Sequence, residues 1–452
     1  MRPWTAAVAV ALLLASTTLS AAAFPPEPPT PPLPQRWIIS LRPDADTVHA
    51  LTQLAPLGLV LHRDRALTVG AYRALVVEPS FATTDAATDV DHAVHALVQR
   101  DPIAAAAKIA TALHSVAAHV DVDTPVRVAA PPGVWDVRGA PPADACVTRD
   151  EKPRNWGLDR IDQPALPLDG VYASPCLPRS ANRSIVNYVV DTGIFVKHEE
   201  FQGRATWGTT VVSGASDEDK NGHGTFVAGV IGGRTCGVYK QAQLVAVKAL
   251  DDKGQGSTSD VITALQWVAN QVGESDQIAI VNLSIGGFYS RSLNDAVNAG
   301  AKNGLIMIVA AGNEGINACL TSPASATGAI AVGATDRNDL IAKFSNIGAC
   351  VEILAPGVNV TSASIRSKTA YVVESGTSFA SPHVAGLLGL YAATSLLPAL
   401  VERFDERGGW EAVAAKDALT KTLYDRAVKD QVTIPFSVFS PTPNLLAQVW
   451  PS

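Results

Sequence analysis

The sequence has no excess of positive charge. Its 35 lysines and arginines are outnumbered by 42 aspartates and glutamates, which gives a formal net charge of -7 at pH 7. Nucleic-acid-binding proteins usually carry a basic face or stripe, together with a recognisable motif. Neither is present here, so the sequence gives no support to nucleic-acid binding and we expect no nucleic-acid partner.

Beyond its N-terminus the sequence also lacks any apolar run long enough to span a bilayer. Met1 and Arg2 precede the apolar run AAVAVALLLA, which leads to small residues suited to signal peptidase at 21–23. This pattern is typical of a secretory signal peptide. We therefore expect a signal peptide over residues 1–23 and a secreted, extracellular protein with no membrane contact. The alternatives are a vacuolar or lysosome-like compartment and an uncleaved membrane anchor.

Cysteine is scarce and its count is odd. The five cysteines are Cys146, Cys176, Cys236, Cys319 and Cys350. An exported chain can form disulfides. With five thiols, at least one is unpaired, removed with a cleaved segment or bonded to another chain.

The first part of the chain predicts a small domain between two irregular segments. The run FPPEPPTPPLPQ, residues 24–35, is rich in prolines, which lack N–H donors, and it indicates a stiff, extended spacer. Strand patterns RWIISLRP and YRALVVEPS flank an amphipathic helix pattern, and an Ala-rich helical segment at 89–120 precedes a third strand, TPVRVAA. This order favours a ferredoxin-like α+β domain over residues 36–130. Prolines and glycines then predict a linker over 131–154 that contains a processing site.

Residues 155–452 predict a larger α/β domain. The apolar runs IVNYVV, AQLVAVKAL, IAIVNLSI, LIMIVAAG and AIAVGAT alternate with helical patterns. Continuous Val/Ile runs indicate strands covered on both faces, hence a mainly parallel sheet in a doubly wound domain. Such sheets place their working residues at the carboxyl ends of the strands.

Four polar residues stand at these strand ends or at helix starts. Asp191 ends a strand in VVDTGI, and His223 stands between two glycines in NGHGTF. Asn313 follows a strand in VAAGNE, and Ser378 precedes an apolar helix in SGTSFA. Taken singly, each has an ordinary structural explanation as a turn or helix-starting residue. Their joint occurrence in the order Asp, His, Asn, Ser favours nucleophilic catalysis by serine, and differs from the order in chymotrypsin-like enzymes and α/β-hydrolases.

With these motifs the chain resembles the subtilisin-like serine proteases (subtilases, peptidase family S8), and within them the secreted proteinase K-like branch. The resemblance covers residues 156–447. The segments that carry it are VVDTGI, NGHGTFVAGVIGG, AQLVAVKALDDKGQGSTSDVI, VNLSIGG, VAAGNE, SPASATGAIAVGATD, FSNIGACVEILAPG and SGTSFASPHVAGL. It implies the subtilisin-like fold and a serine endopeptidase that needs no cofactor for catalysis. Residues 36–130 resemble the inhibitor I9-type propeptide of the family.

The resemblance assigns Ser378 as nucleophile, His223 as general base and then acid, and Asp191 as the group that orients the imidazole. Asn313 and the Ser378 N–H would hold the oxyanion. Polypeptide substrate would bind as an added strand between two segments and place one side chain in an uncharged pocket, which implies broad specificity with a preference for apolar or aromatic residues before the cut. The implied substrate-binding residues are Gly254, Gln255, Gly256, Ser284, Ile285, Gly286, Ala310, Ala311 and Gly312.

The same resemblance implies further features. It pairs Cys319 with Cys350, and places a possible structural calcium at the carbonyls of Thr327 and Ala329 and the carboxylate of Glu352, where the family typically has Asp. Phe226 and Phe379 replace common family residues without taking part in proton transfer, so we expect them to act on packing. The protein's own propeptide would act as an intramolecular inhibitor, and the mature protein is expected to be a monomer.

Some alternatives stay open on the sequence. A catalytically silent subtilase-fold binding protein would lack a triad member, and none is missing; a latent, propeptide-inhibited form is a third possibility. Asn182 and Asn359 open glycosylation sequons, whereas Asn282 opens one that we expect to be unmodified. Six of the nine histidines precede the linker. Acid-triggered propeptide release could use them, but we expect them at solvated surface positions.

Overall fold

The computed structural model describes residues 36–57, 59–79, 102–129, 135–137, 149–173, 185–273, 277–396, 412–434 and 442–449. The expected signal peptide and spacer lie outside these residues, as do most of the linker, Cys146, Cys176 and Asn182. No helix in the described ranges is long and apolar enough to cross a membrane. All described residues belong to one compact unit, residues 35–452.

The first elements form a small α+β domain. They are β1 (Trp37–Leu41), α1 (Thr47–Thr52), the 3-10 helix η1 (Ala55–Leu57), β2 (Leu59–Val69), β3 (Tyr72–Pro79), α3 (Pro102–Ala112) and β4 (Ala117–Val122). The strands pair antiparallel in the order β2-β3-β1-β4. Trp37 and Ile39 pack with the apolar residues of α1 and α3, whereas Ile38 packs with apolar residues of the larger domain. The βαββαβ order agrees with the predicted ferredoxin-like arrangement.

Two details of this domain differ from the prediction. The Ala-rich helix predicted over 89–120 is wrong at its C-terminal end, because α3 ends at Ala112 and residues 117–122 form β4. The strand β2 is also absent from the prediction. The helix ends early because residues 117–122 pair with β1 as strand β4, with Trp37 opposite Val122 and Ile39 opposite Val120. Such long-range pairing outweighs the local helix preference of alanine.

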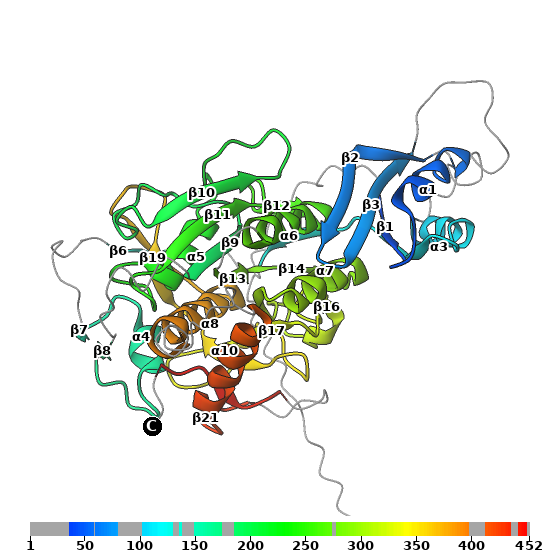
Figure 1. Cartoon of the computed structure of the whole chain (residues 1–452). Coiled ribbons are helices and arrows are strands. Elements are labelled where there is room, and N and C mark those ends of the chain that lie inside the picture. Colours follow the sequence, from blue (N-terminus) through cyan, green and yellow to red (C-terminus); the bar gives the residue numbers. More distant parts are fainter. Residues whose placement is uncertain are drawn as a thin grey trace, which may run out of the picture. The chain divides into compact units, whose positions relative to one another are not determined.

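A nine-stranded sheet forms the centre of the larger domain (Figure 1). Its order is β10-β11-β9-β13-β15-β17-β18-β22-β21, parallel from β10 to β22, with β21 antiparallel at the edge. The strands are β9 (Ile185–Asp191), β10 (Ala205–Thr210), β11 (Gln243–Lys248), β13 (Ile278–Leu283), β15 (Ile306–Ala310), β17 (Ala329–Thr335), β18 (Ile353–Pro356), β21 (Val428–Lys429) and β22 (Leu445–Leu446). All five strands predicted from Val/Ile runs are present.

Helices cover both faces of this sheet. Successive strand residues pack into opposite apolar clusters: Val189 and Ile308 into one, and Val190 and Val309 into the other. The first cluster contains residues of α5 (His223–Gly232) and α8 (Thr377–Tyr391). The second contains residues of α6 (Thr258–Gly273) and α7 (Arg291–Lys302). This is the predicted doubly wound arrangement.

The remaining described elements lie around this framework. They are β5 (Pro125–Val128), β6 (Trp135–Val137), β7 (Arg149–Glu151), α4 (Trp156–Ile161), β8 (Val171–Ala173), β12 (Gln255–Ser257), β14 (Ile285–Phe288), the 3-10 helix η3 (Ala318–Leu320), β16 (Thr321–Ser322), β19 (Val360–Ala363), β20 (Tyr371–Glu374), the π-helix η4 (Ala392–Leu396) and α10 (Ala412–Arg426).

The predicted disulfide between Cys319 and Cys350 is confirmed, with an S–S distance of 2.11 Å. Cys236 is unpaired and buried, and its thiol donates to a carboxylate oxygen of Glu200. Burial raises the pKa of Cys236 well above the usual value of a thiol. Among the five cysteines, only Cys146 and Cys176 are left as a second pair.

The N-terminal histidines do not all lie at solvated positions as expected. His49 and His114 are exposed, but His62 is buried and His119 is half-buried. His62 lies between the Arg36 guanidinium, 2.9 Å from its Nε2, and the Glu78 carboxylate, 2.6 Å from its Nδ1. These two contacts hold the ring inside the small domain. His92 and His95 lie outside the described residues.

Candidate active site

Ser378 lies in the first turn of α8. The helix begins at Thr377 after an extended Gly376, and the Ser378 side chain is buried. Backbone N–H groups in a first helical turn have no acceptor within the helix, and the helix dipole favours negative charge near them. The position therefore combines a hydroxyl with N–H donors that can stabilise an anion.

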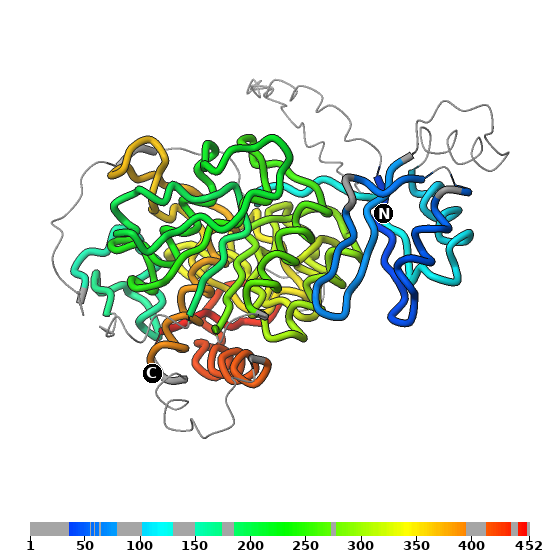
Figure 2. Tube along the Cα trace, turned by 45° about the horizontal axis from the view of Figure 1, so that its top comes forward, coloured from blue at the N-terminus to red at the C-terminus, as the bar shows by residue number. Residues whose placement is uncertain are grey.

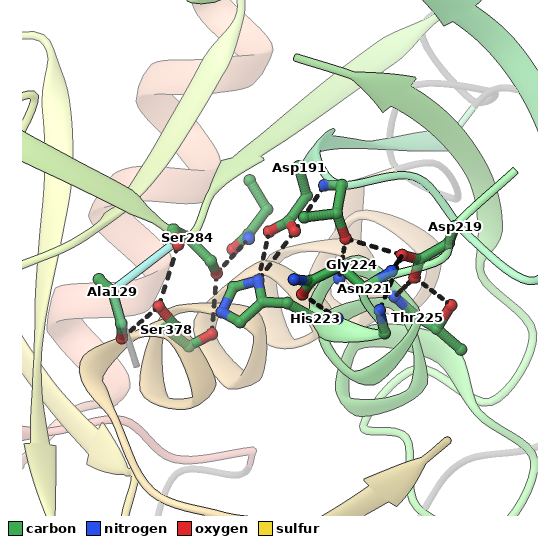
Figure 3. Close-up of polar contacts among 12 residues, drawn as sticks. Ala129, Asp191, Asp219, Asn221, His223, Gly224, Thr225, Ser284 and Ser378 are labelled. Carbon is green, nitrogen blue, oxygen red and sulfur yellow. Dashed lines mark hydrogen bonds and ion pairs between the residues drawn. The ribbon is translucent and has the colours of Figure 1, made fainter. Parts of the chain in front are cut away.

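Asp191 and His223 form a buried pair at the end of β9 and the start of α5 (Figure 3). His223 Nδ1 lies 2.8 Å from Asp191 Oδ1 and 2.9 Å from Oδ2. Burial lowers the pKa of His223, but the charge and hydrogen bond of Asp191, with smaller contributions from Glu374 and Asp219, outweigh it and leave that pKa raised. Donation from Nδ1 to Asp191 leaves the Nε2 lone pair available to accept a proton.

The hydroxyl of Ser378 does not bond to His223 in this conformation. Among the described residues, buried His223 Nε2 has no hydrogen-bond partner. The Ser378 Oγ instead donates to the carbonyl of Ala129 at 2.5 Å and to that of Ser284 at 2.9 Å. The hydroxyl must therefore turn to His223 before the imidazole can accept its proton, a contact that often tightens only in the reacting complex.

Asn313 points its amide at the same carbonyl of Ala129. Its Oδ1 accepts from the Thr377 N–H and the Thr377 hydroxyl, both at 2.9 Å. These two bonds fix the orientation of the amide, so that Nδ2 faces outward and donates to Ala129 O. The carbonyl of Ala129 is thus held by two side chains, those of Asn313 and Ser378.

Residues 125–129 run between the two predicted substrate-binding segments. In Figure 2 they belong to the cyan tube that passes from the small domain to the larger one. Strand β5 pairs antiparallel with β12, where Arg127 lies opposite Gln255. On its other edge it pairs with β14, where Val128 lies opposite Ile285. The Ala129 N–H continues this pairing to the carbonyl of Ser284, at 3.3 Å. The chain thereby brings together six of the residues predicted to bind substrate: Gly254, Gln255, Gly256, Ser284, Ile285 and Gly286.

The other three predicted residues connect β15 to Asn313. Ala310 and Ala311 are buried, and Gly312 has a φ of +105°. A Cβ at Gly312 would lie 2.2 Å from Asn346 Nδ2, so only glycine fits there. Asn346 donates to the carbonyl of Ala311 and to Glu314, which holds this turn in place.

Sequence reasoning missed the side chains that hold the site in place. Thr377 orients Asn313, and Asp219 accepts hydrogen bonds from the turn before His223. Both stand next to predicted residues, in SGTS and in DKNGHG. A hydroxyl or carboxylate one to four residues from a catalytic candidate is the signal that would have pointed to them.

Phe226 and Phe379 act in packing, as expected. Both are fully buried, and their ring centroids lie 4.3 Å apart. The Phe379 ring centroid is also 5.4 Å from that of His223. The imidazole therefore rests against an apolar aromatic ring.

Several known proteins are similar in sequence to this chain. Subtilisin-like protease 2 of Pseudogymnoascus destructans is 48% identical over 264 residues, 58% of this chain and 64% of that protein. The extracellular serine proteinase of Thermus sp. strain Rt41A is 39% identical over 369 residues, 79% of this chain and 80% of that protein. The chain spans 59% of the length of the subtilase-type proteinase isp6 of Schizosaccharomyces pombe, to which it is 44% identical.

A solved structure is similar in fold to this chain, and one family model matches its sequence. A cold-adapted subtilisin-like serine proteinase is similar with a TM-score of 0.55 and 37% identity, over 65% of this chain and 98% of that one. The model of the Subtilase family, Peptidase_S8, matches residues 183–431, more than half of the chain. This range contains Asp191, His223, Asn313 and Ser378. The chain therefore belongs to the subtilase family.

Proposed function

We propose that this protein is a secreted serine endopeptidase that hydrolyses polypeptides through an acyl-enzyme. The observation that carries the proposal is the position of one peptide carbonyl, that of Ala129, between the Ser378 hydroxyl and the Asn313 amide. The serine hydroxyl lies beside that peptide bond, and the carbonyl oxygen faces a donor that can stabilise the negative charge that develops.

The proposed reaction begins once the Ser378 hydroxyl has turned from the two carbonyls toward His223. His223 Nε2 takes the proton of Ser378 Oγ as that oxygen attacks the carbonyl carbon, and Asp191 stabilises the resulting imidazolium. Asn313 Nδ2 and the Ser378 N–H hold the oxyanion. His223 then gives its proton to the leaving amine, and a water activated in the same way hydrolyses the acyl-enzyme.

Substrates would be selected mainly through their backbones. The strand at 125–129 uses backbone pairing on both edges, which any extended polypeptide can supply. The Val126 side chain is buried among apolar residues of the larger domain. The segment at 310–312, which would line the pocket for the side chain before the cut, contains no charged residue. We expect broad specificity with a preference for apolar or aromatic residues before the cut.

The small domain would act as an intramolecular inhibitor and folding partner. Asp123 accepts from the N–H and the hydroxyl of Ser259 in the first turn of α6, at 2.8 and 2.7 Å. Asp121 accepts from the N–H of Ser292 in the first turn of α7, at 2.6 Å. Two carboxylates thus meet two helix N-termini, where negative charge is favoured. The Arg36 guanidinium forms an ion pair with the buried carboxylate of Asp123, with 3.0 Å between the nitrogen and Oδ2.

The first bond to be cut is expected to be Ala129–Ala130, one residue before the predicted linker. The released small domain should end at Ala129, because that carbonyl faces both Ser378 and Asn313. Mass spectrometry of the earliest fragment would show this. Ala129→Asp should slow the cut, since it places a charge in an uncharged pocket, whereas Ala140→Asp in the linker should not. A first fragment that ends within 131–154 would contradict the assignment.

One assay distinguishes an active endopeptidase from a catalytically silent binding protein and from a latent complex with the small domain. After processing, the protein should hydrolyse casein, and a serine-directed organophosphonate should abolish the activity by blocking Ser378. A catalytically silent binding protein would show no hydrolysis at any stage. A latent complex would show hydrolysis only after the small domain is digested by an added protease.

Secretion is proposed from the apolar N-terminal run and from the similarity to an extracellular proteinase.

The candidate calcium site does not fit the ion, because its one carboxylate is already engaged. The Glu352 carboxylate accepts a hydrogen bond from the Tyr424 hydroxyl, and burial raises the pKa of Glu352, which disfavours the charged form that a calcium ion needs. Among the described residues, no group of three or more His, Cys, Asp or Glu side chains could hold a metal ion.

A further inference from the structure

A second buried carboxylate, Asp219, stands four residues before His223 and outside the proposed triad. Asp219 is 8% exposed. Its two oxygens accept five hydrogen bonds (Figure 3). Oδ1 accepts from Thr192 Oγ1 at 2.9 Å, Gly222 N at 2.8 Å and Asn221 N at 3.1 Å, and Oδ2 accepts from Thr225 N at 3.0 Å and Thr225 Oγ1 at 2.5 Å.

These bonds cap the helix that carries His223. The residue before α5, Gly222, has a φ of +102° and no side chain to satisfy the first N–H groups of the helix. Asp219 supplies the missing acceptor from outside the helix, because it binds the Thr225 N–H. The N–H of Gly224 is satisfied by the hydroxyl of Thr192, at 3.0 Å.

The same carboxylate connects the helix start to the strand end that carries Asp191. Thr192 directly follows Asp191, and its hydroxyl donates to Asp219 while it accepts from Gly224. The backbones are in close contact here, because a Cβ at Gly224 would lie 2.1 Å from the Gly193 carbonyl. Five donors offset the cost of burying the Asp219 charge.

We propose that Asp219 is a positioning residue, which holds the end of β9 and the start of α5 at the separation that the Asp191–His223 hydrogen bond requires. The proposal rests on the triad proposed above. Asp219 does not touch the reacting atoms and acts through the Thr192 hydroxyl and the first turn of α5. Its negative charge also acts on His223, together with the charges of Asp191 and Glu374, in the direction that raises the pKa of the imidazole.

The test uses matched substitutions in the full-length protein after self-processing. Active sites are titrated with an organophosphonate, and kcat and KM are measured on an apolar chromogenic peptide across pH. Asp219→Asn retains one acceptor oxygen of the two, and Thr192→Val removes the linking hydroxyl without changing the side-chain shape. We expect each to lower kcat roughly tenfold to a hundredfold with little change in KM, because small displacements of catalytic groups are costly.

Two readouts separate positioning from a general loss of stability. Thr192→Ser restores the hydroxyl and should recover most of the kcat lost in Thr192→Val. In Asp219→Asn the acid limb of the kcat/KM profile should move to lower pH, because removing a nearby negative charge lowers the pKa of His223. Glu200→Gln is the control, since Glu200 is a buried carboxylate that binds Thr235 and Tyr371 away from the site. It should leave kcat per titrated site unchanged.

The outcomes distinguish this inference from the proposed function. If Ser378→Ala is inactive while Asp219→Asn and Thr192→Val keep the wild-type kcat and pH profile, the positioning role is overturned and the triad stands. If Thr192→Ser is as slow as Thr192→Val, or Glu200→Gln is equally slow, the positioning role is also overturned. If Ser378→Ala remains active, the proposed function itself fails.

Discussion

Ser378→Ala is expected to accumulate outside the cell as an uncut chain that retains the small domain. If the carbonyl of Ala129 is the first one attacked, the cut depends on the Ser378 hydroxyl, which lies 2.5 Å from that carbonyl oxygen. The substitution removes one oxygen at a position where alanine suits a helix well, so the fold should persist. Immunoblotting of secreted protein from a protease-deficient host would compare its size with that of the wild type.

The matched control for this substitution is Ser375→Ala. Ser375 lies three residues earlier, outside α8, and its hydroxyl binds the backbone of Asn359 rather than the site. This variant should mature like the wild type. Appearance of Ser378→Ala at mature size in the same host would mean that another enzyme makes the cut, and self-processing would be rejected.

Asn313→Ala should slow self-processing and peptide hydrolysis by roughly a hundredfold or more without stopping either. The variant retains the nucleophile and the base but loses the side-chain donor to the oxyanion, a loss worth about 3 kcal/mol of transition-state stabilisation. The fall should be in kcat rather than KM, because the negative charge forms only in the transition state. Steady-state kinetics per titrated active site, with the rate of appearance of the released small domain, would measure both.

A second variant shows whether the lost donor or a disturbed helix start is the cause. Asn313 also accepts from the N–H and hydroxyl of Thr377, so alanine leaves these donors unpaired. Asn313→Asp keeps an acceptor for Thr377 but offers no donor to the oxyanion. We expect it to be at least as slow as Asn313→Ala. Recovery of the wild-type rate in Asn313→Asp would show that Asn313 acts on Thr377 and not on the oxyanion.

The sequence determined the central sheet and the identity of the candidate catalytic residues. Runs such as IVNYVV and LIMIVAAG are apolar on both faces, and only a strand covered by helices on both sides can bury them. Parallel strands bring their carboxyl ends to one edge of a sheet, so Asp191 and Asn313 could be expected at the same edge, although β13 lies between the strands that they follow. His223 and Ser378 followed from small residues that precede apolar helices.

The tertiary structure decided how these residues are held and what occupies the site. The direction of the Ser378 hydroxyl, which donates to Ala129 and not to His223, depends on a strand from a distant part of the chain. One of the five hydrogen bonds of Asp219 comes from Thr192, 27 residues away, and no local pattern specifies that bond. Side-chain rotamers and pairings between distant strands are set by packing of the whole unit, so that only the folded chain fixes the geometry on which the proposed reaction depends.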